Sequence, residues 1–210
     1  MKILAIDTST AAASSAIVEN GSLLCEFTIN DGKKHSEKLI NIVNIALENS
    51  GIDINDIDAF ACSIGPGSFT GLRLGAAAVK GFGQALNKPV IAVPTLDALA
   101  YNVFPYSGLI CPILDAQRNM VYSSLYTTKD NELRKLEDYR AIGIDELIEK
   151  LGEFNERIVM LGDAMPIFGE KLKKALPNVI ESSPGTLYPR ASSVALLAEK
   201  LYKEGKALRY

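Results

Sequence analysis

A glycine-rich run in the first half constrains this chain more than any other feature. Residues 63–75 read Ser-Ile-Gly-Pro-Gly-Ser-Phe-Thr-Gly-Leu-Arg-Leu-Gly, and the apolar stretch Ala59–Ile64 leads into them. The pattern predicts a buried strand, a tight turn and a helix with almost no bulk on one face. Such an arrangement holds anions against free backbone N–H groups in many proteins. The same residues also let a helix lie very close to a sheet or to another helix, so two interpretations stay open.

The composition predicts a folded protein in a reducing compartment. Of 210 residues, 48% are apolar and 22% are charged, which suffices for a packed core. The formal net charge of −3 argues against binding nucleic acid alone, because phosphate neutralisation needs a basic face. Cys25, Cys62 and Cys111 form no CxxC pair, so we expect buried thiols. With no signal peptide and no apolar run of roughly 20 residues, we expect a cytoplasmic protein without membrane contact.

The order of predicted elements repeats along the chain. The first half reads as strands at 2–6, 14–18 and 23–29, a helix at 33–50, a strand at 59–64, a helix at 68–86, a strand at 90–93 and a helix from 95 to about 103. The second half reads as strands at 109–114, 120–126 and 133–140, a helix at 145–151, a strand at 157–161, a helix at 165–176, a short strand near 179 and a helix at 191–204. Asp7 and Asp115 end the first strand of each half.

A β-β-β-α-β-α unit used twice is typical of the α/β actin-like ATPase (ASKHA) fold, which has two ribonuclease-H-like lobes. We therefore expect an N-terminal lobe at 1–105, which would carry a partner interface, and a C-terminal lobe at 106–210. The last helix, at about 190–205, either packs within the C-terminal lobe or packs back on the N-terminal lobe.

The first possible site is a phosphate loop. Asp7-Thr8-Ser9-Thr10 lies where an actin-like fold places its first phosphate loop, but Asp and Thr also satisfy turn backbone after a strand. Asp115-Ala116-Gln117-Arg118, at the equivalent place in the second half, has no Gly or Thr and makes a poor phosphate cradle. The candidate residues of a vestigial loop are Asp7, Thr8, Ser9, Gly65, Gly67 and Ser68.

Other catalytic motifs are missing from the sequence. Neither GxxxxGK[ST] nor GxGxxG occurs. His35 is the only histidine, which excludes HExxH and any metal site with two histidines from one chain. A Ser-His-Asp triad would need His35, which stands in a charged helix start. We expect no metal site and no catalytic residue.

The two predicted helices of the first half carry an unusual amount of apolar and small-residue surface. Apolar residues of helix 33–50 cover more than half of its circumference, more than packing on one sheet requires. Helix 68–86 gathers glycines on one face, each costing about 1 kcal/mol relative to alanine. Either a partner covers these faces or both helices are deeply buried in one core. The predicted interface comprises Leu39, Ile42, Val43, Ala46, Leu47, Gly71, Gly75, Ala78 and Phe82.

Four segments together resemble the TsaB (YeaZ) family over nearly the whole chain. They are Ile6-Asp7-Thr8-Ser9, the run Gly65–Arg73, Ala78-Val79-Lys80-Gly81, and Asp115-Ala116-Gln117-Arg118 with Val121-Tyr122. The resemblance implies an actin-like fold and a non-catalytic subunit, related to the M22 glycoprotease homologues and a paralogue of TsaD. TsaD carries a histidine-based metal site and binds nucleotide, and the single His35 agrees with the lack of that site here.

The resemblance also implies a function. The family activates TsaD, which transfers threonylcarbamoyl to N6 of adenosine 37 in tRNAs that read codons starting with A. The two first-half helices would pair with the same helices of TsaD, or of a second copy in a homodimer. The small ATPase TsaE is the third implied component, and tRNA would be met only through the complex. No cofactor is required of this chain, although ATP or ADP binding stays open.

Two other functions stay open from the residues alone. Asp7-Thr8-Ser9 and the Gly65–Ser68 turn would suit an actin-like ATPase or small-molecule kinase. An M22-type metalloprotease is disfavoured because the chain has one histidine.

Overall fold

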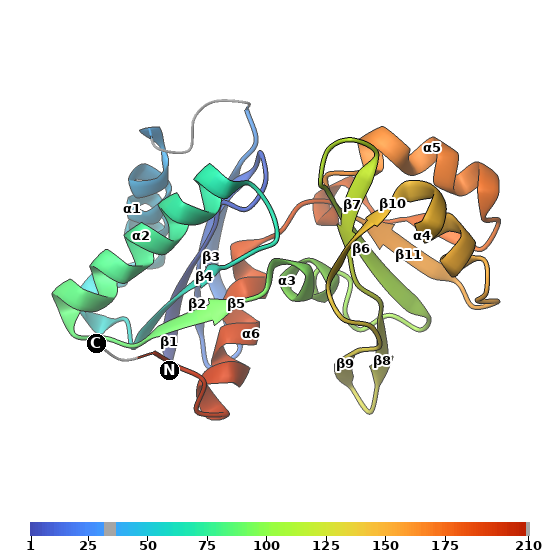
Figure 1. Ribbon diagram of the computed structural model, residues 1–210. Coiled ribbons are helices and arrows are strands. Elements are labelled where there is room, and N and C mark those ends of the chain that lie inside the picture. Colours follow the sequence, from blue (N-terminus) through green and yellow to red (C-terminus); the bar gives the residue numbers. More distant parts are fainter. Residues whose placement is uncertain (32–36, 209–210) are drawn as a thin grey trace. The chain divides into compact units, whose positions relative to one another are not determined.

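The computed structural model of the chain describes residues 1–31 and 37–208, which form two compact units (Figure 1). Unit 1 comprises Met1–Ala98 together with the chain from Pro189 onward, and unit 2 comprises Leu99–Tyr188. The boundary after Ala98 lies before the expected one at 105/106, and the last helix belongs to unit 1, an option that the sequence left open. No helix of the described residues is long and apolar enough to cross a membrane.

Unit 1 is built on a five-stranded sheet with the order β3-β2-β1-β4-β5. β1 pairs antiparallel with β2 and parallel with β4, and β4 pairs parallel with β5. The predicted order of elements is confirmed, although the part of the predicted helix at 33–36, with His35, lies outside the described residues. The elements are β1 (Lys2–Asp7), β2 (Ala13–Glu19), β3 (Ser22–Ile29), α1 (Leu39–Ser50), the short 3-10 helix Ile54–Asp56, β4 (Ala59–Ser63), α2 (Phe69–Leu86), β5 (Val90–Val93), α3 (Thr95–Tyr101) and α6 (Ala191–Lys203).

Helices cover both faces of this sheet. Successive apolar side chains of its central strand, β1, point to opposite faces, so each face needs a cover. Leu4 and Ile6 of β1 point to the face that α1 and α2 cover. Ile3 and Ala5 point to the opposite face, where α6 packs (Figure 1). The near-continuous apolar sequence of β1 is the pattern expected of a strand buried on both sides.

Polar contacts fix the start of α6 to the outer strands of unit 1. The carboxylate of Glu26 on β3 accepts hydrogen bonds from the Ser192 backbone N–H at 2.9 Å and from Arg190 Nε at 2.9 Å. Ser14 Oγ on β2 accepts from the Ala191 N–H at 3.2 Å. These bonds satisfy N–H groups at the helix start, which the helix itself leaves unpaired. They explain why the last helix belongs to unit 1.

Unit 2 contains a seven-stranded sheet with the path β10-β7-β6-β11-β12, and β8 pairs with β6 and β9. α4 and α5 pack over a core that includes Ile113, Leu147 and Met160. The elements are β6 (Leu109–Asp115), β7 (Met120–Ser123), β8 (Tyr126–Lys129), β9 (Glu132–Lys135), β10 (Arg140–Gly143), α4 (Ile144–Leu151), β11 (Ile158–Leu161), α5 (Met165–Ala175), β12 (Val179–Glu181) and the 3-10 helix Pro184–Thr186.

Two strands predicted in the second half are each divided in the structure. The prediction at 120–126 becomes β7 and β8, and the prediction at 133–140 becomes β9 and β10. β8 pairs with β6 before Pro112, whereas β7 pairs with it beyond that residue. Proline has no N–H to donate to a sheet ladder, so the antiparallel partner changes at Pro112.

Candidate functional site

The glycine run forms the turn between β4 and α2 in unit 1. β4 ends at Ser63, and α2 begins at Phe69 with Ser68 as its N-cap. Ser68 Oγ accepts a hydrogen bond from the Gly71 N–H at 3.3 Å. The strand, turn and helix predicted from the run are confirmed, and so is the capping role of Ser68.

The turn after β1 fills the space beside this helix start. The Ser9 carbonyl accepts a hydrogen bond from the Ser68 N–H at 2.7 Å. Gly67 has a φ of 150°, and a Cβ there would collide with the same carbonyl. Thr8 and Ser9 are both buried. The N–H groups of Gly65, Ser68 and Gly71 in this turn therefore meet oxygen atoms of the chain itself.

Gly71 and Gly75 allow α2 to lie directly against the end of β1. A Cβ at Gly71 would overlap the Thr8 carbonyl oxygen, and a Cβ at Gly75 would lie 2.6 Å from Thr8 Oγ1. Thr8 Oγ1 also donates a hydrogen bond to the Gly71 carbonyl at 2.7 Å. Of the two interpretations of the glycine run, close packing within the chain accounts for these two residues.

The Asp7 carboxylate is buried between the ends of β1 and β4. It accepts hydrogen bonds from the Ser9 N–H at 3.0 Å and from Ser9 Oγ at 2.8 Å, and Ser63 Oγ donates to its other oxygen. Burial, with the nearby Asp7 charge, raises the pKa of the Cys62 thiol to about 12. The thiol is therefore neutral at physiological pH and is no nucleophile. Asp7 holds the turn in place through these bonds.

The structure places most residues of the predicted partner interface in the core of unit 1. Leu39, Ile42, Val43 and Ala46 are at most 1% exposed and lie in the core beneath α1 and α2. Gly71 and Gly75 face Thr8 instead of solvent. Leu47, Ala78 and Phe82 are half-buried against the same core. The alternative of two helices packed into one core accounts for most of this apolar surface, because a fully buried side chain cannot reach a partner while the helix is in place.

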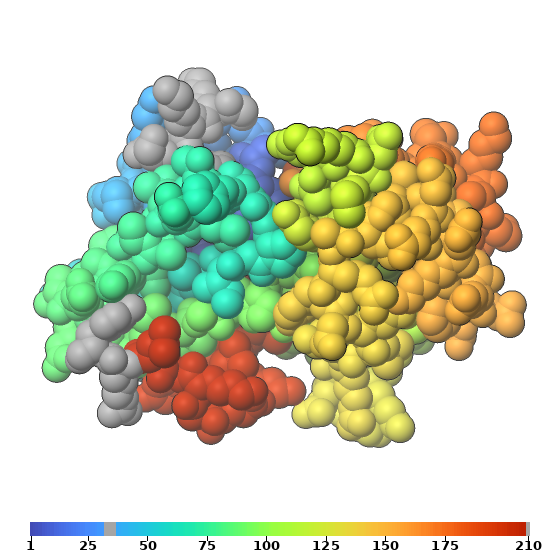
Figure 2. All heavy atoms as spheres, in the orientation of Figure 1, coloured from blue at the N-terminus to red at the C-terminus, as the bar shows by residue number. Residues whose placement is uncertain are grey.

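The surface that α2 offers to solvent is different from the predicted one. Figure 2 shows the outer side of this helix, coloured turquoise to green, at the surface of unit 1. Ala77, Gly81 and Ala85 lie exposed at intervals of four residues, and we refer to them as the outer stripe of α2. A Cβ at Gly81 would meet no other atom within 4 Å. Sequence reasoning missed the stripe, although the four-residue spacing of small residues was a readable signal.

Unit 2 has a different turn at the place equivalent to the first loop. Asp115 Oδ1 accepts from the Gln117 N–H at 2.8 Å, and the Asp115 N–H donates to Asp163 Oδ1 at 2.9 Å. Gln117, Arg118 and Asn119 have φ values of 62°, 53° and 61°. This turn therefore has three successive residues in the left-handed region. Within residues 1–31 and 37–208, no three His, Cys, Asp or Glu side chains are arranged to hold a metal ion.

Asp163 should make the stability of the protein depend on pH. Burial raises the pKa of its carboxyl, with a smaller contribution from the Asp115 charge, while the Asp115 N–H opposes the shift. The folded chain then binds more protons than the unfolded chain, so stability falls as pH rises from about 3.8 through the raised pKa. We expect Asp163→Asn to be more stable than wild type at neutral pH and to lose this slope. Urea unfolding from about pH 4 to pH 7 measures it. An unchanged slope, or the same change in the exposed control Asp138→Asn, would contradict the assignment.

Comparison with known proteins identifies the family. The family described as "TsaD: tRNA N6-adenosine threonylcarbamoyltransferase" matches residues 22–208. The tRNA threonylcarbamoyladenosine biosynthesis protein TsaB of Bacillus subtilis is 30% identical over 203 residues, covering 95% of this chain and 88% of that protein. This chain belongs to the TsaB family. The TsaB of Escherichia coli is 28% identical over 211 residues, covering 99% of this chain and 90% of its own length.

Solved structures confirm the predicted fold for this TsaB-family chain. YeaZ from Pseudomonas aeruginosa matches with a TM-score of 0.82 at 24% identity, over 99% of this chain and 95% of that chain. ROK hexokinase from Thermus thermophilus matches with a TM-score of 0.53 at 12% identity, over 98% and 100% of the two chains. Identity this low shows the fold alone. The actin-like arrangement predicted from the repeated order of elements is therefore confirmed.

Proposed function

We propose that this chain is a non-catalytic accessory subunit for installing threonylcarbamoyl on N6 of adenosine 37 in tRNAs that read codons starting with A. Its TsaB relatives are named as threonylcarbamoyladenosine biosynthesis proteins, and the matching family is described as the transferase TsaD. Two groups that an actin-like ATPase would turn toward a metal–nucleotide complex are engaged inside this chain: Asp7 by Ser9 and Ser63, and the Ser68 N–H by Ser9. This engagement supports a role that uses the fold for assembly.

We further propose that the outer stripe of α2, with the exposed side of α1, contacts a TsaD-type catalytic subunit. Gly81 is the observation that carries this proposal. A glycine inside a helix costs about 1 kcal/mol relative to alanine. Gly71 and Gly75 offset that cost because they let Thr8 lie close to the helix, whereas no atom of the described chain approaches Gly81 in this way. A helix from another subunit that approaches closely along Ala77, Gly81 and Ala85 would account for it.

A TsaD-type subunit is a suitable partner because it shares this fold. The tRNA N6-adenosine threonylcarbamoyltransferase of Kosmotoga olearia is 28% identical over 208 residues, covering 91% of this chain and 60% of that protein. Two related chains can pair through equivalent helices about a pseudo-two-fold axis. The same surface would serve a homodimer when the chain is alone. A TsaE-type ATPase completes the proposed assembly, which meets tRNA as a whole in the cytoplasm.

The proposal assigns no cofactor to this chain. Calorimetric titration of the isolated protein with Mg-ATP tests this directly. We expect no saturable heat. Tight binding that Asp7→Ala abolishes would favour the ATPase or kinase alternative instead.

Gly81→Ala should separate the two kinds of glycine in α2. We expect it to raise the free energy of unfolding by about 0.5–1 kcal/mol, because alanine is the better helix former and its Cβ meets no atom of the described chain. Urea unfolding of the isolated protein measures this gain. Destabilisation would mean that Gly81 has a role within the chain, and the argument for a partner at the outer stripe would be lost.

A further inference from the structure

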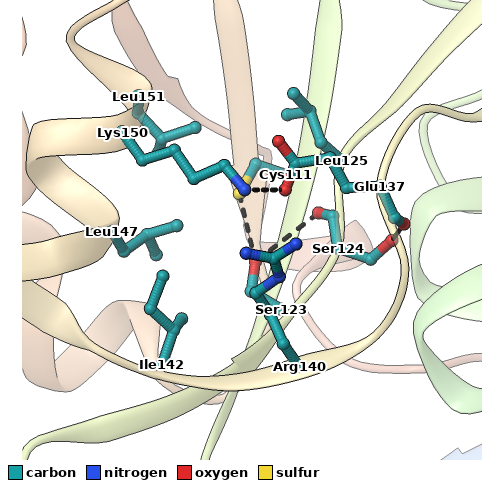
Figure 3. Close-up of a pocket in the computed structure, with 10 residues that line it drawn as sticks. All are labelled: Cys111, Ser123, Ser124, Leu125, Glu137, Arg140, Ile142, Leu147, Lys150 and Leu151. Atoms are coloured by element: carbon teal, nitrogen blue, oxygen red, sulfur yellow. Dashed lines mark hydrogen bonds and ion pairs between the residues drawn. The ribbon is translucent and has the colours of Figure 1, made fainter.

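The pocket between the sheet and α4 of unit 2 has no room for a ligand larger than water (Figure 3). Its free volume of about 10 Å³ holds about one water molecule. Beside it, Lys150 forms an ion pair with Glu137, and the Cys111 thiol lies 3.4 Å from Ser123 Oγ. The pocket therefore belongs to the packing of unit 2. The feature that points to a further interaction lies on unit 1.

Strand β3 is one edge of the unit 1 sheet. Within residues 1–31 and 37–208, β3 pairs only with β2, so its outer side has no partner strand. An unpaired edge presents backbone N–H and C=O groups that another strand can bind. Folded proteins protect such edges with proline, lysine, bulges or short strands. β3 has eight residues, no proline and no lysine, and Glu26 is its only charged residue.

A β-bulge protects only the first part of this edge. The register between β2 and β3 shifts at Leu24, which has no partner on β2. A bulge bends its strand and interrupts regular pairing. Each of the next five residues, Cys25–Ile29, is again in register with β2. We refer to Cys25–Ile29 as the open segment of β3, because it is regular and unprotected.

One side of the open segment is apolar. Cys25 and Ile29 pack partly against the core beneath α1. Phe27 lies two residues from each of them and therefore faces the same side of the sheet. Phe27 is 36% exposed, unlike the other aromatic side chain of this core, Phe60, which is fully buried. A second strand beside β3 would cover the exposed part of Phe27.

The polar side of the open segment is engaged within the chain. The Glu26 carboxylate accepts hydrogen bonds from Arg190 and from the Ser192 N–H, as described for the start of α6. Thr28 Oγ1 shares a hydrogen bond of 2.9 Å with Ser14 Oγ. The one charge of β3 is therefore compensated, and it would not repel a second strand in the way that a free charge does.

We propose that the open segment pairs antiparallel with the same segment of a second copy of this chain, about a two-fold axis at Phe27. A two-fold axis presents the same surface on both copies, so the contact closes on itself. Phe27 then lies directly opposite Phe27 of the other copy, and Cys25 lies opposite Ile29. Aromatic and apolar pairs directly opposite one another stabilise a sheet. The two five-stranded sheets become one continuous sheet.

Other registers of the same pairing are less favourable. An axis at Glu26 would place two carboxylates directly opposite each other, which is destabilising. An axis at Cys25 would bring the bulge at Leu24 into the ladder. An axis at Thr28 would pair only three residues of β3, because the strand ends at Ile29. The axis at Phe27 alone pairs the whole open segment.

This contact is separate from the proposed contact with a TsaD-type subunit. The outer stripe lies on α2, which packs over β1, β4 and β5. β3 is at the opposite end of the sheet from β5. The two surfaces can therefore be tested independently, and failure of one leaves the other standing.

Sedimentation velocity over a concentration series tests the proposal. All proteins carry Ala77→Glu, so that pairing through the outer stripe does not contribute. A five-residue ladder is about 17 Å long and buries less than the roughly 800 Å² per partner of a standard interface. We therefore expect a dimer that dissociates in the micromolar range. Amide hydrogen exchange of residues 25–29 should slow as the dimer forms.

Charge variants at Phe27 test the position of the axis. Phe27→Lys and Phe27→Glu should each weaken the dimer at least about tenfold, because like charges then lie directly opposite. An equal mixture of the two variants should dimerise again, because the lysine of one copy faces the glutamate of the other. Phe27 is partly exposed, and urea unfolding checks that both variants keep the fold.

Ile180→Lys is the matched control. Ile180 is 42% exposed on β12, which is an edge strand of unit 2, and its replacement should leave the dimer unchanged. A chain that stays monomeric at every concentration would overturn the proposal. So would a dimer that survives Phe27→Lys, one that Ile180→Lys weakens equally, or a mixture of the two Phe27 variants that stays monomeric.

Discussion

Replacing Gly71 by alanine is expected to lower the free energy of unfolding by about 3 kcal/mol or more. The added methyl group would overlap the Thr8 carbonyl oxygen. Neither group can rotate away, because the methyl carbon is bonded directly to the helix backbone and the oxygen belongs to the backbone of Thr8. Helix α2 would have to move away from β1, which would also break the bond from Thr8 Oγ1 to the Gly71 carbonyl. Overpacking a tight site costs about 1–3 kcal/mol, and an unpaired buried polar group adds to that cost. Urea unfolding of the isolated protein measures the loss.

Gly81→Ala is the matched control because it makes the same chemical change in the same helix. The two variants should have effects of opposite sign. If both destabilise the protein to a similar degree, Gly81 is packed against another part of the chain, as Gly71 is, and the contrast between the two glycines is wrong. If neither does, α2 does not pack against Thr8 as closely as the structure indicates.

Ala77→Glu is expected to weaken association with a TsaD-type subunit by about 100-fold or more. The glutamate would bring a charge without a partner into a closely packed helix contact, which costs about 3–5 kcal/mol. The isolated protein should keep its stability, because Ala77 is exposed in unit 1. Calorimetric titration of the purified subunits measures the affinity, and urea unfolding checks the fold.

Ala175→Glu is the control for that experiment. Ala175 is also exposed on a helix, at the end of α5 in unit 2, far along the chain from the outer stripe. It should bind like wild type. Normal affinity of Ala77→Glu would remove the outer stripe from the proposed interface. Substitutions at Ile42 or Gly75 would not test this contact, because those residues are buried and their replacement would damage the fold itself.

Much of the fold was predictable because its signals are local. The apolar runs of β1 and β4, the turn at Asn20 and Gly21, and the cap at Ser68 each follow from a few neighbouring residues. The repeated order of elements then led to the actin-like fold. The placement of α6 on unit 1 was left open, since the bonds from Glu26 to Arg190 and Ser192 join residues far apart in the sequence.

Six of the nine residues predicted for the interface are buried within the chain, and the sequence could not show this for a physical reason. Periodicity shows that a helix has an apolar face, but it does not show what covers that face. Ile42 and Val43 carry the pattern of an interface, yet the core of unit 1 covers them. Gly71 and Gly81 look alike in sequence, and only the position of Thr8 distinguishes a glycine that its own chain requires from one that it does not.

The assay that tests the account most directly measures threonylcarbamoylation of adenosine 37 by TsaD-type and TsaE-type subunits, with and without this chain. The account predicts that wild type and Asp7→Asn both support modification, because asparagine can still accept from Ser9, whereas Ala77→Glu does not. Full modification with Ala77→Glu, together with loss of modification in a folded Asp7→Asn protein, would contradict it and would indicate chemistry at the first loop.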